Sequence, residues 1–485
     1  MSKPRPSSGE AARPGDPGEG RRVMGPWSAM SMVAGSMLGI GIFLTPPIVA
    51  GHVSAPAIFF LLWVVGGLAA LSGAVAYAEL GAMMPKAGGD YVFLREAFGA
   101  STAFACGWVI FGAVFTGSIA AMAVPLCQYQ LPALVNPLLD ALPVAGAWRL
   151  DPEAPIFPGA PLDAARALGV ALVLAITGLN ALGARLSAWV QNLTTIVPAA
   201  VFAVGALVVL AVGMPPSSAA EVMAAPTPTA ALSAGALASS YMAVYFAYSG
   251  WNAVNYVAGE VDRPGRNIPL GLLGGTAAIM ALYLLMCAAF IEVLGYGGLK
   301  ASMEAGTAAA TAFGGPKVGW AVTLMIAFGL LGSINGTILG GARVAYAMAR
   351  DGAFWSGAAK LSERHAVPTR ALWIQAAWAC AFIVSGSFEA LLNLVSLAMI
   401  AIGAVTVASV FALRRKSPDV ARPYRITGYP WTPAFYLIAS ALVVAVTIFE
   451  AIQKGKIEGW YPLLGLLILP VAFTIHALGA RRSRA

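Results

Sequence analysis

Apolar stretches of about 20 residues recur along the whole chain, and this recurrence restricts the fold more than any other feature. A bilayer core is about 30 Å thick, and about 20 helical residues cross it. Of the 485 residues, 59% are hydrophobic and 10% are charged. The pattern predicts an all-α polytopic membrane protein with twelve transmembrane helices, at about residues 27–49, 56–83, 99–127, 163–181, 191–213, 235–257, 268–293, 318–349, 370–387, 389–413, 434–452 and 460–479.

Basic residues predict the orientation of these spans, because cytoplasmic loops of membrane proteins are rich in Lys and Arg. With both termini in the cytoplasm, few of the 29 basic residues fall on the outer side, namely Arg149, Arg166, Lys300, Lys317, Lys454 and Lys456. We therefore expect an integral protein of the plasma (inner) membrane. The net charge of +8 fits attraction to anionic lipid and requires no nucleic-acid partner.

Composition and span order predict four regions. Residues 1–24 are rich in Pro, Gly, Arg and Ser, which indicates a disordered cytoplasmic tail rather than a cleaved signal peptide. Residues 25–233 contain spans one to five, and residues 234–415 contain spans six to ten. Residues 416–485 contain spans eleven and twelve with a short cytoplasmic C-terminus.

Two spans are interrupted by small residues. The first contains VAGSMLGIGIFLTPP, with Gly39 and Gly41, and the sixth contains FAYSGWNAVNY, with Ser249 and Gly250. Small residues in membrane helices often serve close packing. Two interruptions at corresponding positions of two halves instead indicate inverted repeats around a midplane substrate site. We expect a five-plus-five inverted repeat with discontinuous helices 1 and 6, spans 1–5 against 6–10.

An unwound span exposes backbone polar groups, which are tolerated at that depth only where they line a cavity. Free N–H groups attract an anion and free C=O groups attract a cation. A zwitterionic α-amino acid satisfies both, with its carboxylate on the amides near Ile40 and Gly41. Its ammonium would meet carbonyl groups near Met37, Phe246, Ala247 and Ser249.

Residues typical of catalysis or metal binding form no recognisable set. The four cysteines and three histidines lack the spacing of a metal site, and no nucleophile, base and orienting group converge by motif. We expect no enzyme, no metal and no cofactor. Glu79 with the following PKAGGDY is interpreted as a structural signature at the cytoplasmic end of span two, and no fixed charge is expected at mid-membrane.

Several segments between residues 27 and 415 resemble one known family, and they occur in its order. They are GSMLGIGIF, AYAELGAMMPKAGGDYVFLREAFG, FAYSGWNAVNY, EVDRPGRNIPLG and GSINGTILGGARVAYAMARDG. They are similar to segments of the amino acid, polyamine and cation (APC) transporter superfamily, and most similar to its L-type amino acid transporter group.

This resemblance implies roles for residues of spans one, six and eight. In the first span, the substrate carboxylate falls on Ile40 and Gly41, and Met37 lies near the ammonium. In the sixth, Phe246 is the aromatic gate, whereas Ala247 and Ser249 offer carbonyl groups to the ammonium. Asn252 would lie at the unwound region, and Asn335 would lie near the substrate pocket.

Two positions depart from the family pattern. Many relatives have Ser or Thr where this chain has Ile40, so the hydroxyl contact to the carboxylate is lost. Pro198 falls where many sodium-independent members have a lysine that is thought to substitute for a bound cation. The coupling ion, proton or sodium, is therefore left open by the sequence.

The sequence predicts a secondary transporter that moves amino acids by alternating access. A neutral substrate for exchange or uptake is favoured, because the pocket spans supply no buried acid to pair a cationic one. A cationic amino acid or polyamine antiporter is the alternative, since aromatic faces also hold cations. An ion channel or membrane receptor is disfavoured, because charge rings, a filter repeat and a signalling domain are not recognisable.

A partner subunit is not expected. Animal L-type relatives tether a glycoprotein through a cysteine in the loop between spans three and four. Here that loop, Gln128 to about Leu162, has no cysteine beyond Cys127 at its start. We therefore expect the amino acid substrate and the lipid bilayer as partners, and no heavy-chain subunit.

Overall fold

The computed structural model describes residues 22, 24–53, 55–140, 149–156, 162–213, 233–362, 367–385, 388–454, 463, 466 and 469–474. This part of the chain is helical, and its β-type pairings are two isolated bridges, Met24 with Val261 and Pro155 with Asp163. Eight helices are long and apolar enough to cross a bilayer, and a ninth span results if one bent pair counts as one. The structure is thus that of a polytopic membrane protein.

The bent pair is the predicted first span. It consists of α1 (Pro26–Met37) and α2 (Gly41–His52), which meet at 43°. The sixth span is also divided, into α11 (Ala234–Ala247) and a 3-10 helix, η4 (Ala253–Glu260). Both interruptions predicted from the sequence are therefore confirmed.

The other predicted spans match helices, with shifted ends. They are α3 (Pro56–Met83), α8 (Ala164–Ala181), α9 (Ala184–Val212), α12 (Pro264–Ala301), α13 (Ala305–Arg350), α14 (Thr369–Ser385), α15 (Phe388–Lys416) and α16 (Trp431–Lys454). The eighth begins earlier than predicted, because a short helix joins it at Gly315, whose φ of 80° suits glycine. The predicted twelfth span lies mostly outside the described residues, so the count of twelve and the inverted repeat stay predictions.

The third span is longer than predicted and contains two wide turns. It runs through α5 (Ala100–Val109), the π-helix η1 (Ile110–Phe115), α6 (Thr116–Pro125), the π-helix η2 (Leu126–Gln130) and α7 (Leu131–Asp140). A π-helical turn shifts the side chains that follow it around the helix axis, and such turns occur often at functional sites.

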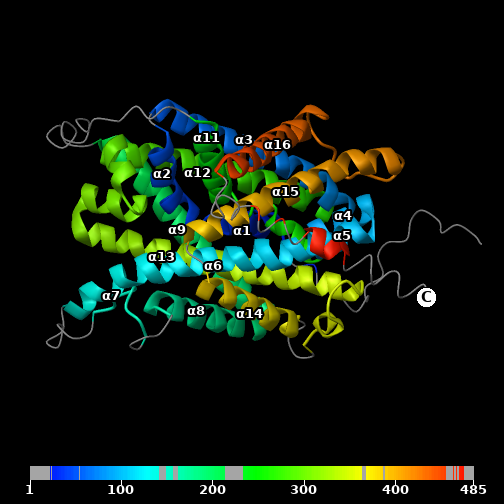
Figure 1. The fold of residues 1–485 in the computed structure, drawn as a ribbon, viewed down its shortest axis with the longest axis horizontal. Helices are drawn as coiled ribbons and strands as arrows, with labels where there is room; N and C mark the ends of the chain where they lie inside the picture. The colour runs from blue at the N-terminus through cyan, green and yellow to red at the C-terminus, as the bar shows by residue number, and fades with distance from the viewer. Residues whose placement is uncertain are drawn as a thin grey trace, which may run out of the picture.

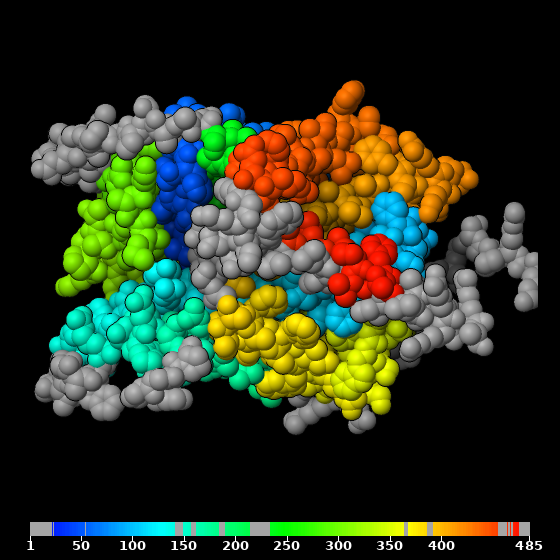
Figure 2. Space-filling view, viewed as in Figure 1, coloured from blue at the N-terminus to red at the C-terminus, as the bar shows by residue number. Residues whose placement is uncertain are grey.

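The divided spans lie inside the bundle, and whole helices surround them. In Figure 1, α8 and α14 lie side by side at one edge, and α3 and α16 lie at the opposite edge. Figure 2 shows the blue α2 only as a narrow strip on this face. Large apolar side chains point outward on α9 and α16, including Val204, Leu207, Ile438 and Leu442. These outer faces suit contact with lipid tails.

The two breaks interlock through glycines. A Cβ atom on Gly250 would lie 2.5 Å from the carbonyl oxygen of Ser36 on α1. A Cβ on Gly41, at the start of α2, would overlap the backbone of Ala247 at the end of α11. Each break therefore needs a glycine because the other broken span passes directly over it.

The segment after α3 turns back into the bundle. Gly88 and Gly89 have φ of 118° and 51°, and they lead into α4 (Asp90–Phe98), whose first residue is buried. Nearby, buried Glu79 accepts hydrogen bonds from Arg414 at 3.0 and 2.6 Å and from the Ile426 amide at 2.9 Å. This pairing confirms a structural role for Glu79.

Candidate functional site

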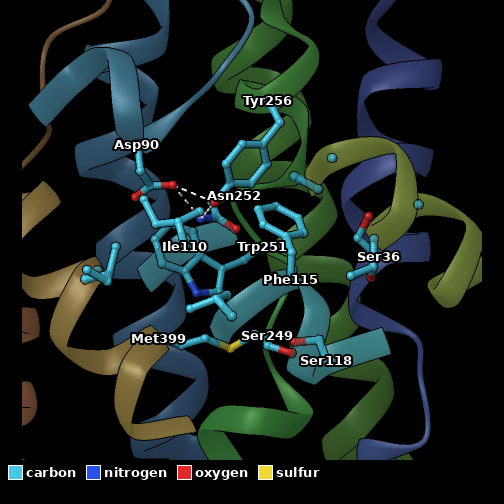
Figure 3. A pocket seen from close by; sticks show the side chains of 18 of the residues that line it. Ser36, Asp90, Ile110, Phe115, Ser118, Ser249, Trp251, Asn252, Tyr256 and Met399 are labelled. Atoms are coloured by element: carbon cyan, nitrogen blue, oxygen red, sulfur yellow. Dashed lines mark hydrogen bonds between the residues drawn. The ribbon is translucent and has the colours of Figure 1, made fainter. Parts of the chain in front are cut away.

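A cavity of about 100 Å³ lies beside the break of the sixth span (Figure 3). Its walls come from α1, α3, α4, the third span, α11, η4, α13 and α15. Hydroxyl and amide groups face it together with aromatic and methionine side chains. The polar residues of the lining include Ser36, Asp90, Ser118, Ser249, Asn252 and Thr337. A small polar molecule would find both hydrogen-bond partners and apolar contacts here.

Three residues predicted for the substrate site line this cavity: Phe246, Ser249 and Asn252. They lie together because α11 ends at Ala247 and the next five residues are turns. Gly250 makes the turn with φ of 95°, a conformation that other residues rarely adopt. The break thereby presents the Ser249 hydroxyl and the Asn252 amide to the cavity.

The three predicted residues of the first span do not line the cavity. Met37 and Ile40 are 2% and 1% exposed, and Gly41 packs on the predicted site residue Ala247. The Met37 carbonyl already accepts hydrogen bonds from the Gly39 amide at 2.8 Å and from the Tyr283 hydroxyl at 2.6 Å. The N-cap residue of α2, Ile40, makes no side-chain cap hydrogen bond, and the first amides of a helix have no acceptor within it.

Asn335 is buried on α13, outside the cavity lining, and its amide donates to Gln191 on α9 at 3.1 Å. Two residues earlier on α13, the Ser333 hydroxyl lies 3.0 Å from the Gly35 carbonyl and 2.8 Å from the Leu38 carbonyl. Carbonyl groups at the end of α1, where a cation would be attracted, thus face a neutral hydroxyl donor.

Pro198 lies close to this end of α1. A Cβ on Gly329 would be 3.7 Å from the Leu38 carbonyl oxygen and 3.9 Å from the Pro198 ring. The ring has no hydrogen-bond donor, so it cannot pair these carbonyl groups as a lysine would. Ser333 supplies the donor instead, from the facing helix.

Asp90 corrects the expectation that the pocket contains no buried acid. This carboxylate is 1% exposed and lines the cavity. It accepts hydrogen bonds from the hydroxyls of Tyr77, Tyr256 (2.5 Å) and Thr406 (2.8 Å), and from the Asn252 amide at 3.4 Å (Figure 3). Burial raises the pKa of Asp90 above its usual value, whereas the hydroxyl hydrogen bonds act in the opposite direction.

The sequence predicts no site role for Asp90, because PKAGGDY is interpreted as a structural signature at the end of the second span. The glycine pair before it turns the chain inward, and a Cβ on Gly89 would lie 2.6 Å from the Tyr256 ring. The consecutive glycines in PKAGGDY were the available signal for this turn. They show that the chain passes closely under η4.

Ser118 was also missed, because a π-helical turn directs it inward and no sequence pattern marks such a turn. Ser118 is 6% exposed, and its buried hydroxyl has no hydrogen-bond partner in the described part of the chain. Figure 3 shows it close to Ser249 at the lower end of the cavity. A buried hydroxyl without a partner is costly, so a bound molecule or water would pair with it.

Aromatic side chains form the wall of the cavity opposite Ser36. Trp251 packs edge-on against Tyr77, with ring centroids 4.7 Å apart, and against Tyr436 at 6.0 Å. The hydroxyls of Tyr245 and Tyr436 lie 2.5 Å apart. In the described ranges, no group of three or more His, Cys, Asp or Glu residues could hold a metal ion. The wall of the cavity thus combines aromatic rings with hydroxyl and amide groups and one carboxylate, Asp90.

Comparisons with known proteins agree with this arrangement. A family model described as amino acid permease matches residues 24–473. The human b(0,+)-type amino acid transporter 1 is 28% identical over 455 residues, 92% of this chain and 86% of that protein. The human large neutral amino acids transporter small subunit 2 is 26% identical over 494 residues, 98% of this chain and 85% of that protein. The chain therefore belongs to the amino acid permease family, as an integral membrane transporter of amino acids and not an enzyme.

Proposed function

We propose that this protein exchanges or takes up neutral amino acids by alternating access around the cavity between its divided spans. The observation that carries the proposal is the break of the sixth span, which opens Ser249 and Asn252 onto the cavity. Family membership supplies the substrate class, amino acids. The cavity supplies the argument for a neutral side chain.

A zwitterion would bind across the two breaks. Its ammonium would meet the carbonyl end of α11 near Ala247 and Ser249, and its carboxylate would meet the free amides of Ile40 and Gly41 at the start of α2. Phe246 lines the cavity next to Ala247, which itself contacts Gly41. Movement of the Phe246 ring would then connect the cavity with the amides of α2.

The lining favours a small and neutral side chain. A cavity of about 150 Å³ accommodates benzene, and this one measures about 100 Å³. Its one carboxylate, Asp90, already accepts from four neutral donors, so a cationic side chain would have to displace them. Alanine or serine fits these limits better than lysine or a polyamine.

The transporter is proposed to work without a heavy-chain subunit. The name of one relative includes the words small subunit, so a partner has to be tested here. Cys127 is 3% exposed within η2, and a disulfide to another chain would require it to reach the surface. A second protein that co-purifies in stoichiometric amount from the native membrane would contradict this part of the proposal.

Counterflow in proteoliposomes tests the substrate. Vesicles preloaded with unlabelled alanine should accumulate labelled alanine at least about tenfold over empty vesicles, which corresponds to about 1.4 kcal/mol. Phe246→Ala should lower this ratio severalfold, whereas Phe435→Ala, on the exposed face of α16, should not. Stimulation by internal lysine or putrescine but not alanine would contradict the neutral substrate, and ion currents without counterflow would favour a channel.

A further inference from the structure

Asp90 is a buried carboxylate with no cation beside it. No Lys, Arg or His lies within ion-pair distance in the described residues, and all four hydrogen-bond donors are neutral. Ionised carboxylates are rarely buried unless they are paired. When Asp90 is ionised, the cavity carries one negative charge without a fixed counter-charge among the described residues, so a mobile species would have to neutralise it.

The charged groups at the same end of the bundle are engaged elsewhere or line a separate cleft. Arg95 pairs with Asp351, Arg343 with Glu260, and Arg414 with Glu79, whereas Lys416 donates to the Ala97 carbonyl. Lys86, Glu96 and Arg350 line a second cleft, which does not include Asp90. The other titratable groups that act on Asp90 are neutral at physiological pH, namely Tyr77, Cys106, Tyr245, Tyr256 and Tyr436.

A proton fits this position better than a cationic side chain. Both carboxylate oxygens already have donors, so an ammonium group would need to expel at least one of them. A proton needs no such space, because the Tyr256 hydroxyl can turn from donating to Oδ2 to accepting from it. The carboxylate lines the cavity, so water in the cavity can reach it.

We propose that Asp90 binds the proton that is co-transported with a neutral amino acid. A hydronium ion that reaches the cavity gives its proton to Oδ2 and leaves a water molecule, so the charge of the cavity changes from negative to neutral. With a neutral substrate, one positive charge then crosses the membrane per cycle. The inference rests on the proposed function, since it needs an amino acid that moves through this cavity.

The hydrogen bonds link the proton to the moving part of the site. Tyr256 and Asn252 belong to η4 and to the break before it, whereas Tyr77 and Thr406 belong to the whole helices α3 and α15. The ionised carboxylate holds η4 against these helices. On protonation, the hydrogen bond from the Asn252 amide to Oδ2 weakens, because the oxygen loses its negative charge and becomes a donor itself. Proton binding thereby loosens η4 from the helices that do not unwind.

The test uses the full chain in proteoliposomes with labelled alanine and an inward proton gradient of about two pH units. One proton per substrate permits an accumulation ratio of about 100-fold at this gradient. We expect accumulation by the wild type, and a ratio near one for Asp90→Asn. Glu304→Gln is the matched control, because Glu304 is a buried carboxylate that caps α13 outside the cavity. It should keep the wild-type ratio.

A second variant keeps the test decisive if Asp90→Asn is inactive. Thr406→Val removes one donor to the ionised carboxylate, so the midpoint of the pH dependence of uptake should rise by about one pH unit. Thr447→Val is the control. The Thr447 hydroxyl is buried on α16 and donates to a carbonyl of the same helix, so its removal should leave the midpoint unchanged.

The outcomes separate the two proposals. Wild-type counterflow without proton-driven accumulation would overturn the role of Asp90 and leave the proposed function standing. Gradient-driven accumulation by Asp90→Asn, or an unmoved midpoint in Thr406→Val, would overturn it as well. Absence of counterflow with any amino acid would instead contradict the proposed function itself.

Discussion

The two breaks look alike in sequence, yet they differ in what surrounds them. The first break is three residues long, and two of these residues, Leu38 and Ile40, are each 1% exposed. Its carbonyl groups face hydroxyl donors of Ser333 and Tyr283 from neighbouring helices. The second is five residues long, and four of its residues line the cavity.

This difference shows that an unwound span is not by itself a binding site. At the first break, hydroxyls from other helices satisfy the carbonyl groups, so only the amides at the start of α2 are left for a ligand. Where the break faces a cavity, its polar groups remain available to a ligand and to Asp90. We therefore expect substitutions at the two breaks to have different effects, the largest at Gly250.

Gly250→Ala should destabilise the protein most. The new Cβ would meet the Ser36 carbonyl and force an alanine to adopt φ of 95°. We expect a loss of about 2 to 5 kcal/mol, measured as a large drop in Tm of the purified protein in detergent. Gly178→Ala on α8 has open space around it and should leave Tm within a few degrees. An unchanged Tm for Gly250→Ala would show that the two breaks do not contact each other.

Ser333→Ala should destabilise the first break. It leaves the carbonyl groups of Gly35 and Leu38 without this donor, at a cost of about 1 to 3 kcal/mol. Denaturation of the purified variant measures this loss. Ser385→Ala at the exposed end of α14 is the control and should change stability by less than about 0.5 kcal/mol. Equal stabilities would mean that the first break is not held by this hydroxyl.

Ser118→Ala should weaken substrate binding without loss of stability. The hydroxyl has no partner in the described residues, so its removal breaks no hydrogen bond within them. If a bound amino acid pairs with it, KM for alanine should rise about two- to tenfold. Ser240→Ala is the matched control, because the Ser240 hydroxyl is also buried without a partner in the described residues but lies outside the cavity. A similar KM change in both variants would contradict a role for Ser118.

Replacement of sodium by a large organic cation should have the smallest effect, and we expect it to change alanine counterflow little. The carbonyl end of α1 already faces the Ser333 hydroxyl, so counterflow should stay within about twofold. Measurements at equal ionic strength check this expectation. A strong requirement for sodium would show that the carbonyl groups of the first break bind a cation. The first break would then be an ion-binding site, contrary to the difference between the two breaks described above.

Much of the architecture could be predicted from the sequence, because bilayer thickness fixes the length of an apolar helix. The spans 56–83 and 163–181 match their helices closely, and both interruptions were found from glycine placement. The ends of spans three and eight were wrong because their helices continue past the apolar stretch, through π-turns and through Gly315.

The site could be predicted only in part. The break of span six places Phe246, Ser249 and Asn252 together because they are neighbours in sequence. Asp90 and Ser118 reach the same cavity through a glycine turn and a π-helix, and neither follows from hydrophobic periodicity. The substrate roles of Met37, Ile40, Gly41, Ala247 and Asn335 stay predictions, since these residues lie outside the cavity lining.

The interlocked glycines have a mechanical consequence. Because Gly250 lies against Ser36 and Gly41 lies against Ala247, neither broken span can tilt or slide without displacing the other. We therefore expect the four half-helices to move together. A transporter that opened its two faces by independent movements could open both at once and let ions leak through. A shared movement would avoid that state, so we expect the two glycine contacts to limit ion leakage.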